Sequence, residues 1–163
     1  MAKKSKAFDE LLYQQRWATA SEKSFQKLEK NINRDSGKKI QIVRNAPDIV
    51  KMSDVLREFV RPYINDAKNK REIQTLFEMA ASAWNLAVMP EEERIAMLDK
   101  LLAKKQKNSD VSMSIKLLEA LIRRKQKYFK DNHRMIMDFQ VEYLGQGEYH
   151  LSVASTQPKP ALE

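Results

Sequence analysis

The segment from Asn132 to Thr156 constrains the fold more than any other part of this chain. Apolar residues occupy alternate positions on both sides of the break Gly145-Gln146-Gly147. They are Met135, Met137, Phe139, Val141 and Tyr143 before the break and Tyr149, Leu151 and Val153 after it. Alternation of β-branched and aromatic residues around a glycine-rich turn is typical of a β-hairpin. We therefore predict strands at about residues 134–144 and 148–155.

A three-residue loop, Gly145 to Gly147, predicts the register of this hairpin. It pairs Leu144 with Glu148 and places Tyr143 opposite Tyr149, so that apolar side chains share one face, as a buried face requires. The other face then carries Asp138, Gln140, Glu142, His150 and Ser152. We expect this polar face to be open to solvent. The apolar face is expected to lie on the last helix or on the helix near residues 69–89, because a hairpin alone is marginally stable.

The rest of the chain has the apolar spacing of amphipathic helices. Helices are predicted at about residues 7–34, 53–65, 70–88, 91–106 and 111–130. Pro62 is expected to kink or end the second helix near Val60, and residues 38–45 are a candidate short third strand. The helix of residues 91–106 is expected to bury Ile95, Leu98, Leu101 and Leu102. The predicted fold class is mainly α with a C-terminal antiparallel β-hairpin (α+β), in which four or more helices pack on the hairpin.

The N-terminal helix has a narrow apolar stripe on a very polar surface. Leu11, Ala18, Phe25 and Ile32 recur every seven residues, so one edge of the helix docks on something. Two alternatives stay open: the stripe packs against its own domain, or it forms a homodimer or docking contact through residues 7–34. The domain organisation is accordingly residues 1–36 as a basic amphipathic arm, 37–156 as a single globular domain and 157–163 as a disordered tail.

Composition excludes several classes of protein. The chain of 163 residues has no cysteine, so it forms no disulfide and has no thiolate nucleophile. No segment approaches the roughly 20 apolar residues of a membrane span, and a cytoplasmic location is expected. Only three glycines are present, two of them in the hairpin turn, so a glycine-rich phosphate loop is nearly excluded. No cofactor-binding fingerprint is recognised.

Positive charge is concentrated near the end of the helical region. Residues 100–134 contain 11 basic and 3 acidic residues, within a chain of net charge +8. Binding candidates are Lys116, Arg123, Arg124, Lys127 and Lys130 on the last helix, with Lys104 and Lys105 on the preceding one. Such a row favours an anionic partner, either an acidic protein surface or nucleic acid. The alternative is an ordinary solvated helix face.

Catalytic candidates are confined to the polar face of the hairpin. Glu142 and His150 are a minimal carboxylate–imidazole pair, with Asp138 nearby, and Asp131 and His133 extend the set toward a metal site. Glu142 and His150 also fit an ordinary cross-strand pair, and no closely repeated ligand spacing is present, so no metal site is predicted. A small hydrolase or metal-dependent enzyme is the alternative to the favoured interpretation.

That favoured interpretation is a non-catalytic binding or scaffolding module. Trp84, at a helix corner, is a recognition anchor or a core residue, and its place on the apolar face favours the core.

Overall fold

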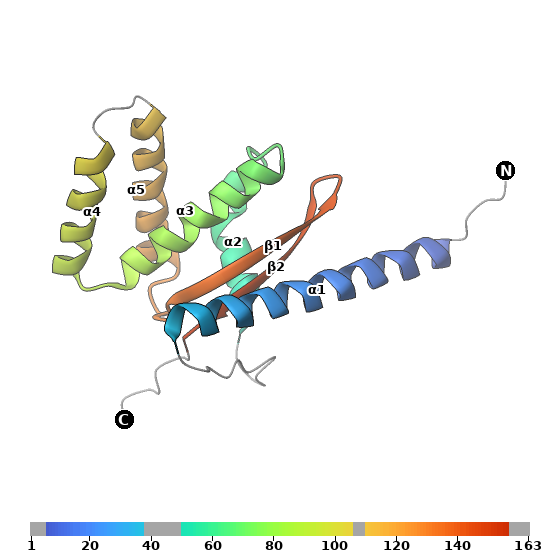
Figure 1. Cartoon of the computed structure of the whole chain (residues 1–163). Coiled ribbons are helices and arrows are strands. Elements are labelled where there is room, and N and C mark those ends of the chain that lie inside the picture. The colour runs from blue at the N-terminus through green and yellow to red at the C-terminus, as the bar shows by residue number, and fades with distance from the viewer. Residues whose placement is uncertain (1–5, 38–49, 106–109, 157–163) are drawn as a thin grey trace. The chain divides into compact units, whose positions relative to one another are not determined.

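The computed structural model describes residues 6–37, 50–105 and 110–156, which form five helices and two strands. In chain order they are α1 (Lys6–Ser36), α2 (Met52–Ile64), α3 (Lys70–Val88), α4 (Glu91–Lys105), α5 (Asp110–Tyr128), β1 (Ile136–Gly145) and β2 (Glu148–Ser155) (Figure 1). The two strands form a two-stranded antiparallel sheet. The predicted fold class, α+β with a C-terminal hairpin, is confirmed.

Two helices end close to their predicted limits. Pro62 lies inside α2, which ends at Ile64, within a residue of the predicted end at 65 and beyond Val60. α5 ends at Tyr128, so Lys130 lies beyond the helix. The candidate strand at residues 38–45 and the tail at 157–163 fall outside the described residues.

The hairpin turn is shorter than predicted. β1 ends at Gly145 and β2 begins at Glu148, which leaves a loop of two residues. Both have positive φ, 54° at Gln146 and 78° at Gly147, as a type I′ turn requires. The predicted three-residue loop is therefore wrong, because the type I′ turn matches the right-handed twist of the strands.

The strands of the hairpin also differ in length. β1 has 10 residues and β2 has 8. At the base of the hairpin, the backbone N–H of Thr156 donates to the carbonyl of Met135, with N and O 2.9 Å apart. Strands paired at both ends can differ in length only if the longer one has extra residues, as in a β-bulge. A single register with Tyr143 opposite Tyr149 does not hold along the whole hairpin.

The chain divides into two compact units. The first consists of residues 1–53 and 137–154, and the second of residues 54–136 and 155–163. The first contains α1 and nearly all of the hairpin. The second contains α3, α4, α5 and α2 from Asp54 onward. The division into an arm of residues 1–36 and a domain of residues 37–156 stays a prediction.

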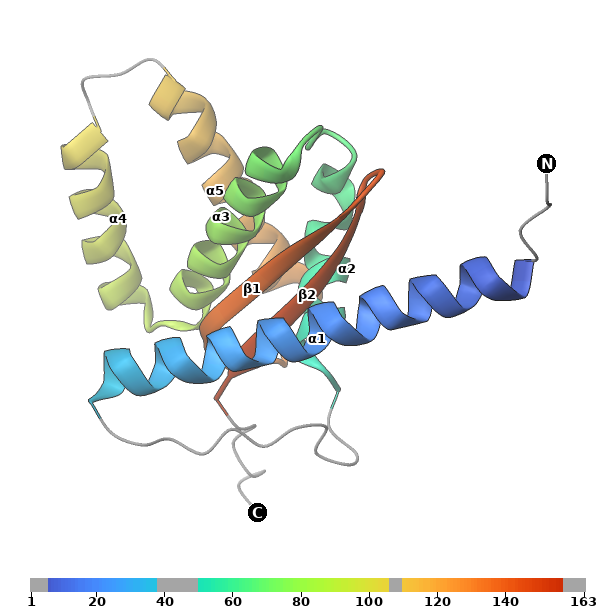
Figure 2. The ribbon, with the colours of Figure 1, turned by 45° about the vertical axis from the view of Figure 1, so that its right-hand side comes forward.

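In the first unit, α1 runs along the hairpin. Its buried residues recur every four positions, at Ala20, Ser24, Leu28 and Ile32, so they form one stripe. Leu28 and Ile32 form a small core with Ala154 of β2. Figure 2 shows α1 beside both strands. The C-terminal half of α1 thus packs within its own chain.

In the second unit, an aromatic cluster joins α2, α3 and the residue after α5. The rings of Phe59, Trp84 and Phe129 meet edge to face, with centroids 5.3 to 5.7 Å apart. Edge-to-face packing suits the charge distribution of aromatic rings. Trp84 has no exposed surface, which confirms it as a core residue.

The end of α3 binds the segment that leads into β1. The indole N–H of Trp84 donates to the carbonyl of Arg134 over 2.7 Å. The side-chain amide of Asn85 donates to the carbonyl of Ile136 and accepts from its N–H, each over 2.8 Å. The adjacent residues Trp84 and Asn85 thereby fix where β1 begins.

Candidate functional site

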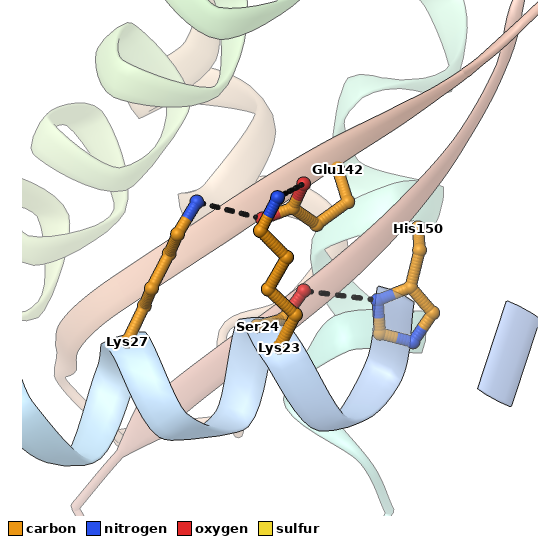
Figure 3. A network of polar contacts seen from close by, with 5 residues as sticks. All are labelled: Lys23, Ser24, Lys27, Glu142 and His150. Atoms are coloured by element: carbon orange, nitrogen blue, oxygen red, sulfur yellow. Dashed lines mark hydrogen bonds and ion pairs between the residues drawn. The ribbon is translucent and has the colours of Figure 1, made fainter. Parts of the chain in front are cut away.

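A polar seam joins α1 to the hairpin in the first unit (Figure 3). The Ser24 hydroxyl and the Nδ1 atom of His150 lie 3.4 Å apart. Ser24 has no exposed surface and His150 is 7% exposed. The Trp17 ring meets the imidazole edge to face, with centroids 4.7 Å apart. His150 is thus enclosed by α1 rather than presented to solvent.

Two carboxylates of β1 continue this seam. The Nζ atom of Lys27 donates to Glu142 over 2.9 Å, and Lys23 lies 3.8 Å from the same carboxylate. Farther along, the amide of Asn31 donates to Asp138 over 3.2 Å. The expectation of a polar hairpin face open to solvent is therefore wrong. The buried stripe of α1 includes the polar residue Ser24, and the polar face of the hairpin supplies a hydrogen-bonding partner for its hydroxyl.

The seam brings together side chains of types that are used in catalysis, but here they attach one element to another. A hydroxyl beside an imidazole is the pair used to activate a serine nucleophile. Ser24, however, has no surface that a substrate can reach, and the Glu142 carboxylate binds lysine ammonium groups. We interpret the seam as the attachment of α1. The lysine side chains are about half exposed, so each ion pair contributes about 0–1 kcal/mol.

The remaining metal candidates do not converge. His133 and Asp131 are both exposed, in the segment between α5 and β1. Within the described residues, no three histidine or acidic side chains are grouped so that they could hold a metal ion.

The predicted basic residues have three different surroundings. Lys116, Arg123 and Lys127 are exposed on α5, and their spacings of seven and four residues place them on one side of that helix. We call these three the basic row. Lys130 is exposed in the turn after α5. Lys104 and Lys105 lie in the last turn of α4, and their side chains fall outside the description.

The side chain of Arg124 forms hydrogen bonds within the second unit. Its Nε atom donates to the carbonyl of Phe59 over 2.9 Å, and an Nη atom donates to that of Glu58 over 3.1 Å. Its guanidinium also lies over the Tyr128 ring, 5.3 Å from the centroid. These bonds hold α2 against α5, so Arg124 stands apart from the basic row.

Lys125, which the sequence did not single out, is buried. Its ammonium donates to the carbonyls of Phe129 and Asn132 over 2.6 and 2.7 Å and lies 4.5 Å from the centroid of the Trp84 ring. Burial lowers the pKa of Lys125, and the nearby charge of Asp131 opposes part of that change. This ammonium closes the C-terminal end of α5, where the helix dipole favours a cation.

An apolar groove lies between α3, α4 and α5. Its volume is about 230 Å³. It is lined by Glu78, Met79, Ser82, Leu98, Leu101, Leu102, Ser114, Ile115, Leu118 and Glu119. Leu102 is 37% exposed, and Ile95, on the same edge of α4, is 50% exposed, so the expectation that both are buried is wrong. Amphipathic spacing identifies the apolar side of a helix but not whether another element covers it.

Comparisons with known proteins give no relative. No family model matches the chain, and neither a curated protein nor a solved structure shows a significant match. Among the described helices, none combines the length and the hydropathy that crossing a membrane requires. Functional inference therefore depends on the two surfaces of the second unit, the basic row and the apolar groove.

Proposed function

We propose that this protein is a cytoplasmic, non-catalytic binding or scaffolding module whose second unit captures an acidic amphipathic helix of a protein partner. The observation that carries this proposal is the adjacency of the basic row and the apolar groove on α5. Glu119 lines the groove, and it follows Lys116 by three residues and precedes Arg123 by four. Side chains at these spacings are neighbours on a helix surface.

The two surfaces match the two sides of an amphipathic helix. Leu98, Leu102 and Ile115 offer apolar contact in the groove, as helix-in-groove recognition requires. Lys116 and Arg123 then lie beside the occupant, where acidic side chains meet them. No hydrogen bond or ion pair from the described residues engages either cation.

The groove also discriminates among partners. Glu78 and Glu119 are part of its lining, and they repel acidic groups placed directly over them. The acidic side chains of the partner must therefore lie on the far side of Glu119, toward the basic row. Repulsion at one position and attraction at another together specify the orientation of the bound helix.

Nucleic acid is the less favoured partner. A row of three cations supplies phosphate contacts, but the adjoining surface is apolar and bears two carboxylates, which suit a protein helix better than a phosphate backbone. The sequence contains no recognised element that reads base edges.

A display selection tests the proposal with a set of candidate helices. The probe is a library of 16-residue amphipathic helices with randomised apolar and charged positions, selected on the full chain. We expect enrichment of leucine-like residues on one side and of Asp or Glu along one flank. An absence of enrichment, or enriched helices without an acidic flank, overturns the proposal.

Variants then locate the binding surface. Arg123→Glu is expected to weaken the enriched helices about tenfold or more, corresponding to about 1.4 kcal/mol, and Leu102→Glu is expected to weaken them similarly. Arg71→Glu makes the same change of charge at an exposed position of α3 outside the groove, and it should leave affinity unchanged.

Labelled duplex DNA and single-stranded RNA form a parallel arm of the same titrations. Tight, salt-dependent nucleic-acid binding that falls with Arg123→Glu but not with Leu102→Glu would replace the acidic helix with nucleic acid as the partner.

A further inference from the structure

The N-terminal half of α1 has an exposed apolar side. α1 is 31 residues long, but its buried positions begin only at Ala20. Leu11 is 62% exposed, Phe8 is 50% exposed and Leu12 is 37% exposed. Figures 1 and 2 both show this half of the helix extending past the hairpin. Several large apolar side chains close together on one exposed segment mark an interaction surface.

A groove lies along the same side of the helix. It has a volume of about 450 Å³, and its lining from α1 includes Leu12, Gln15 and Thr19, at spacings of three and four residues. Tyr143 and Leu144, near the end of β1, line its opposite side. A spacing of three and four residues is the pattern that a helix presents to a second helix. The groove therefore has the side-chain spacing of a surface that binds a second helix.

Two charged residues of this half of α1, Asp9 and Arg16, can pair with the same residues of a second copy; Arg16 also lines the groove. Asp9 and Arg16 are seven residues apart, so they lie on one side of α1, two turns from each other. In an antiparallel pair related by a twofold axis, each contact occurs twice. A pair centred near Tyr13 sets Asp9 of each copy opposite Arg16 of the other and forms two ion pairs. A parallel pair instead sets Asp9 beside Asp9 and loses this complementarity.

We infer that the N-terminal half of α1 is a self-association surface, whose occupant is the same segment of a second copy in antiparallel orientation. The sequence left open whether α1 packs on its own domain or on a partner. The inference assigns these roles to different parts of the helix: Trp17 and the buried positions from Ala20 to Ile32 contact the hairpin, and the exposed side of residues 8–19 binds the second copy. It is independent of the helix-binding function proposed for the second unit, because it involves other residues.

Charge exchange on the full chain tests the inference. Mass is measured by sedimentation equilibrium from low to high micromolar concentration, where the unaltered chain is expected to change from monomer toward dimer. Arg16→Asp is expected to lower the association constant about tenfold or more, since it sets two like charges opposite one another at two places. The double variant Asp9→Arg with Arg16→Asp restores opposite charges and is expected to recover association.

Two controls make the result specific. Glu10→Arg reverses a neighbouring charge on another side of α1 and should leave association unchanged. Leu12→Ser removes apolar contact and should weaken association in every charge background. A chain that stays monomeric at all concentrations overturns the inference, and so does association that ignores Arg16→Asp or is not recovered by the double variant.

A lipid surface is the other occupant that this apolar side would suit. Co-sedimentation with vesicles of neutral and of anionic phospholipid tests it. Vesicle binding that is lost in Leu11→Ser, by a chain that is monomeric in solution, would assign the surface to lipid instead of to a second copy.

Discussion

Among the described residues, the side chains without exposed surface are all apolar in the second unit and include three aromatic rings, whereas in the first unit the fully enclosed side chain is a serine. Trp84, Phe59 and Phe77 are fully enclosed in the second unit. In the first, Ser24 is enclosed, and the described buried apolar residues include no aromatic ring; they are Ala20, Leu28, Ile32, Met52, Leu151 and Ala154. Burial of apolar area supplies most of the free energy of folding, so the second unit has the larger reserve of stability.

The two units also differ in the interactions that attach a helix to the rest of the unit. In the second unit, burial of aromatic rings is supplemented by hydrogen bonds from Arg124 and Lys125. In the first, α1 is held by a thin apolar stripe and by polar pairs such as Lys27–Glu142. Polar pairs contribute little net free energy when water can replace them. We therefore expect α1 to detach from the hairpin before the second unit unfolds.

The largest effect is expected at the aromatic cluster. Trp84→Ala removes an enclosed ring, its edge-to-face contacts with Phe59 and Phe129 and its hydrogen bond to Arg134. The free energy of unfolding should fall by about 3–5 kcal/mol, as measured by urea denaturation followed by circular dichroism. Trp17→Ala, at a half-buried ring of the first unit, is the matched control and should cost less than half as much. Equal costs would contradict the contrast between the units.

A smaller effect is expected at the seam. Ser24→Ala removes the buried hydroxyl that contacts Nδ1 of His150. It should lower the free energy of detaching α1 from the hairpin by about 1–3 kcal/mol. The ¹⁹F NMR signal of 5-fluorotryptophan at position 17 reports this change, because the Trp17 ring contacts His150. Ser82→Ala, at an exposed serine of α3, is the control and should have almost no effect.

A double-mutant cycle makes this second prediction specific to the pair. If the hydroxyl and the imidazole interact, the costs of Ser24→Ala and His150→Ala are not additive. Strict additivity of the two costs would refute the interaction.

Most of the secondary structure is predictable because hydrophobic periodicity is local. The alternation of Met137, Phe139 and Val141 locates the first strand, and the spacing of Ile73, Leu76 and Phe77 locates α3. The turn is not predictable in the same way because Gln146 adopts a positive φ, which is uncommon for residues other than glycine and which a sequence pattern does not reveal. The difference in length between the two strands depends on how they pair, and it has no local signature in the sequence.

The seam escapes prediction for a different reason. The predicted apolar stripe of α1 and its buried stripe share Leu28 and Ile32, but the buried stripe continues through Ala20 and Ser24 instead of Ala18 and Phe25. A serine within a helix carries no sign that it will be enclosed, since that depends on the partner surface it meets. His150 and Glu142 are identifiable as polar residues on one strand face, but the element that covers that face is more than a hundred residues away in the chain.

The basic row is more predictable than the groove beside it. Spacing alone identifies Lys116, Arg123 and Lys127, because exposed residues three, four or seven apart share a helix side. Spacing also groups Arg124 with them, yet it binds the carbonyls of α2. The groove requires the relative positions of α3, α4 and α5, which no pattern within one helix supplies.

The central claim, that the first unit opens before the second, has a direct test because each unit contains one of the two tryptophans of the chain. With 5-fluorotryptophan incorporated, ¹⁹F NMR follows Trp17 and Trp84 separately during a urea titration, and Trp17→Phe assigns the two signals. The chain used carries Arg16→Asp, so that self-association does not contribute. We expect the Trp17 signal to reach its unfolded position at a lower urea concentration than the Trp84 signal. Coincident transitions with equal slopes would contradict the account.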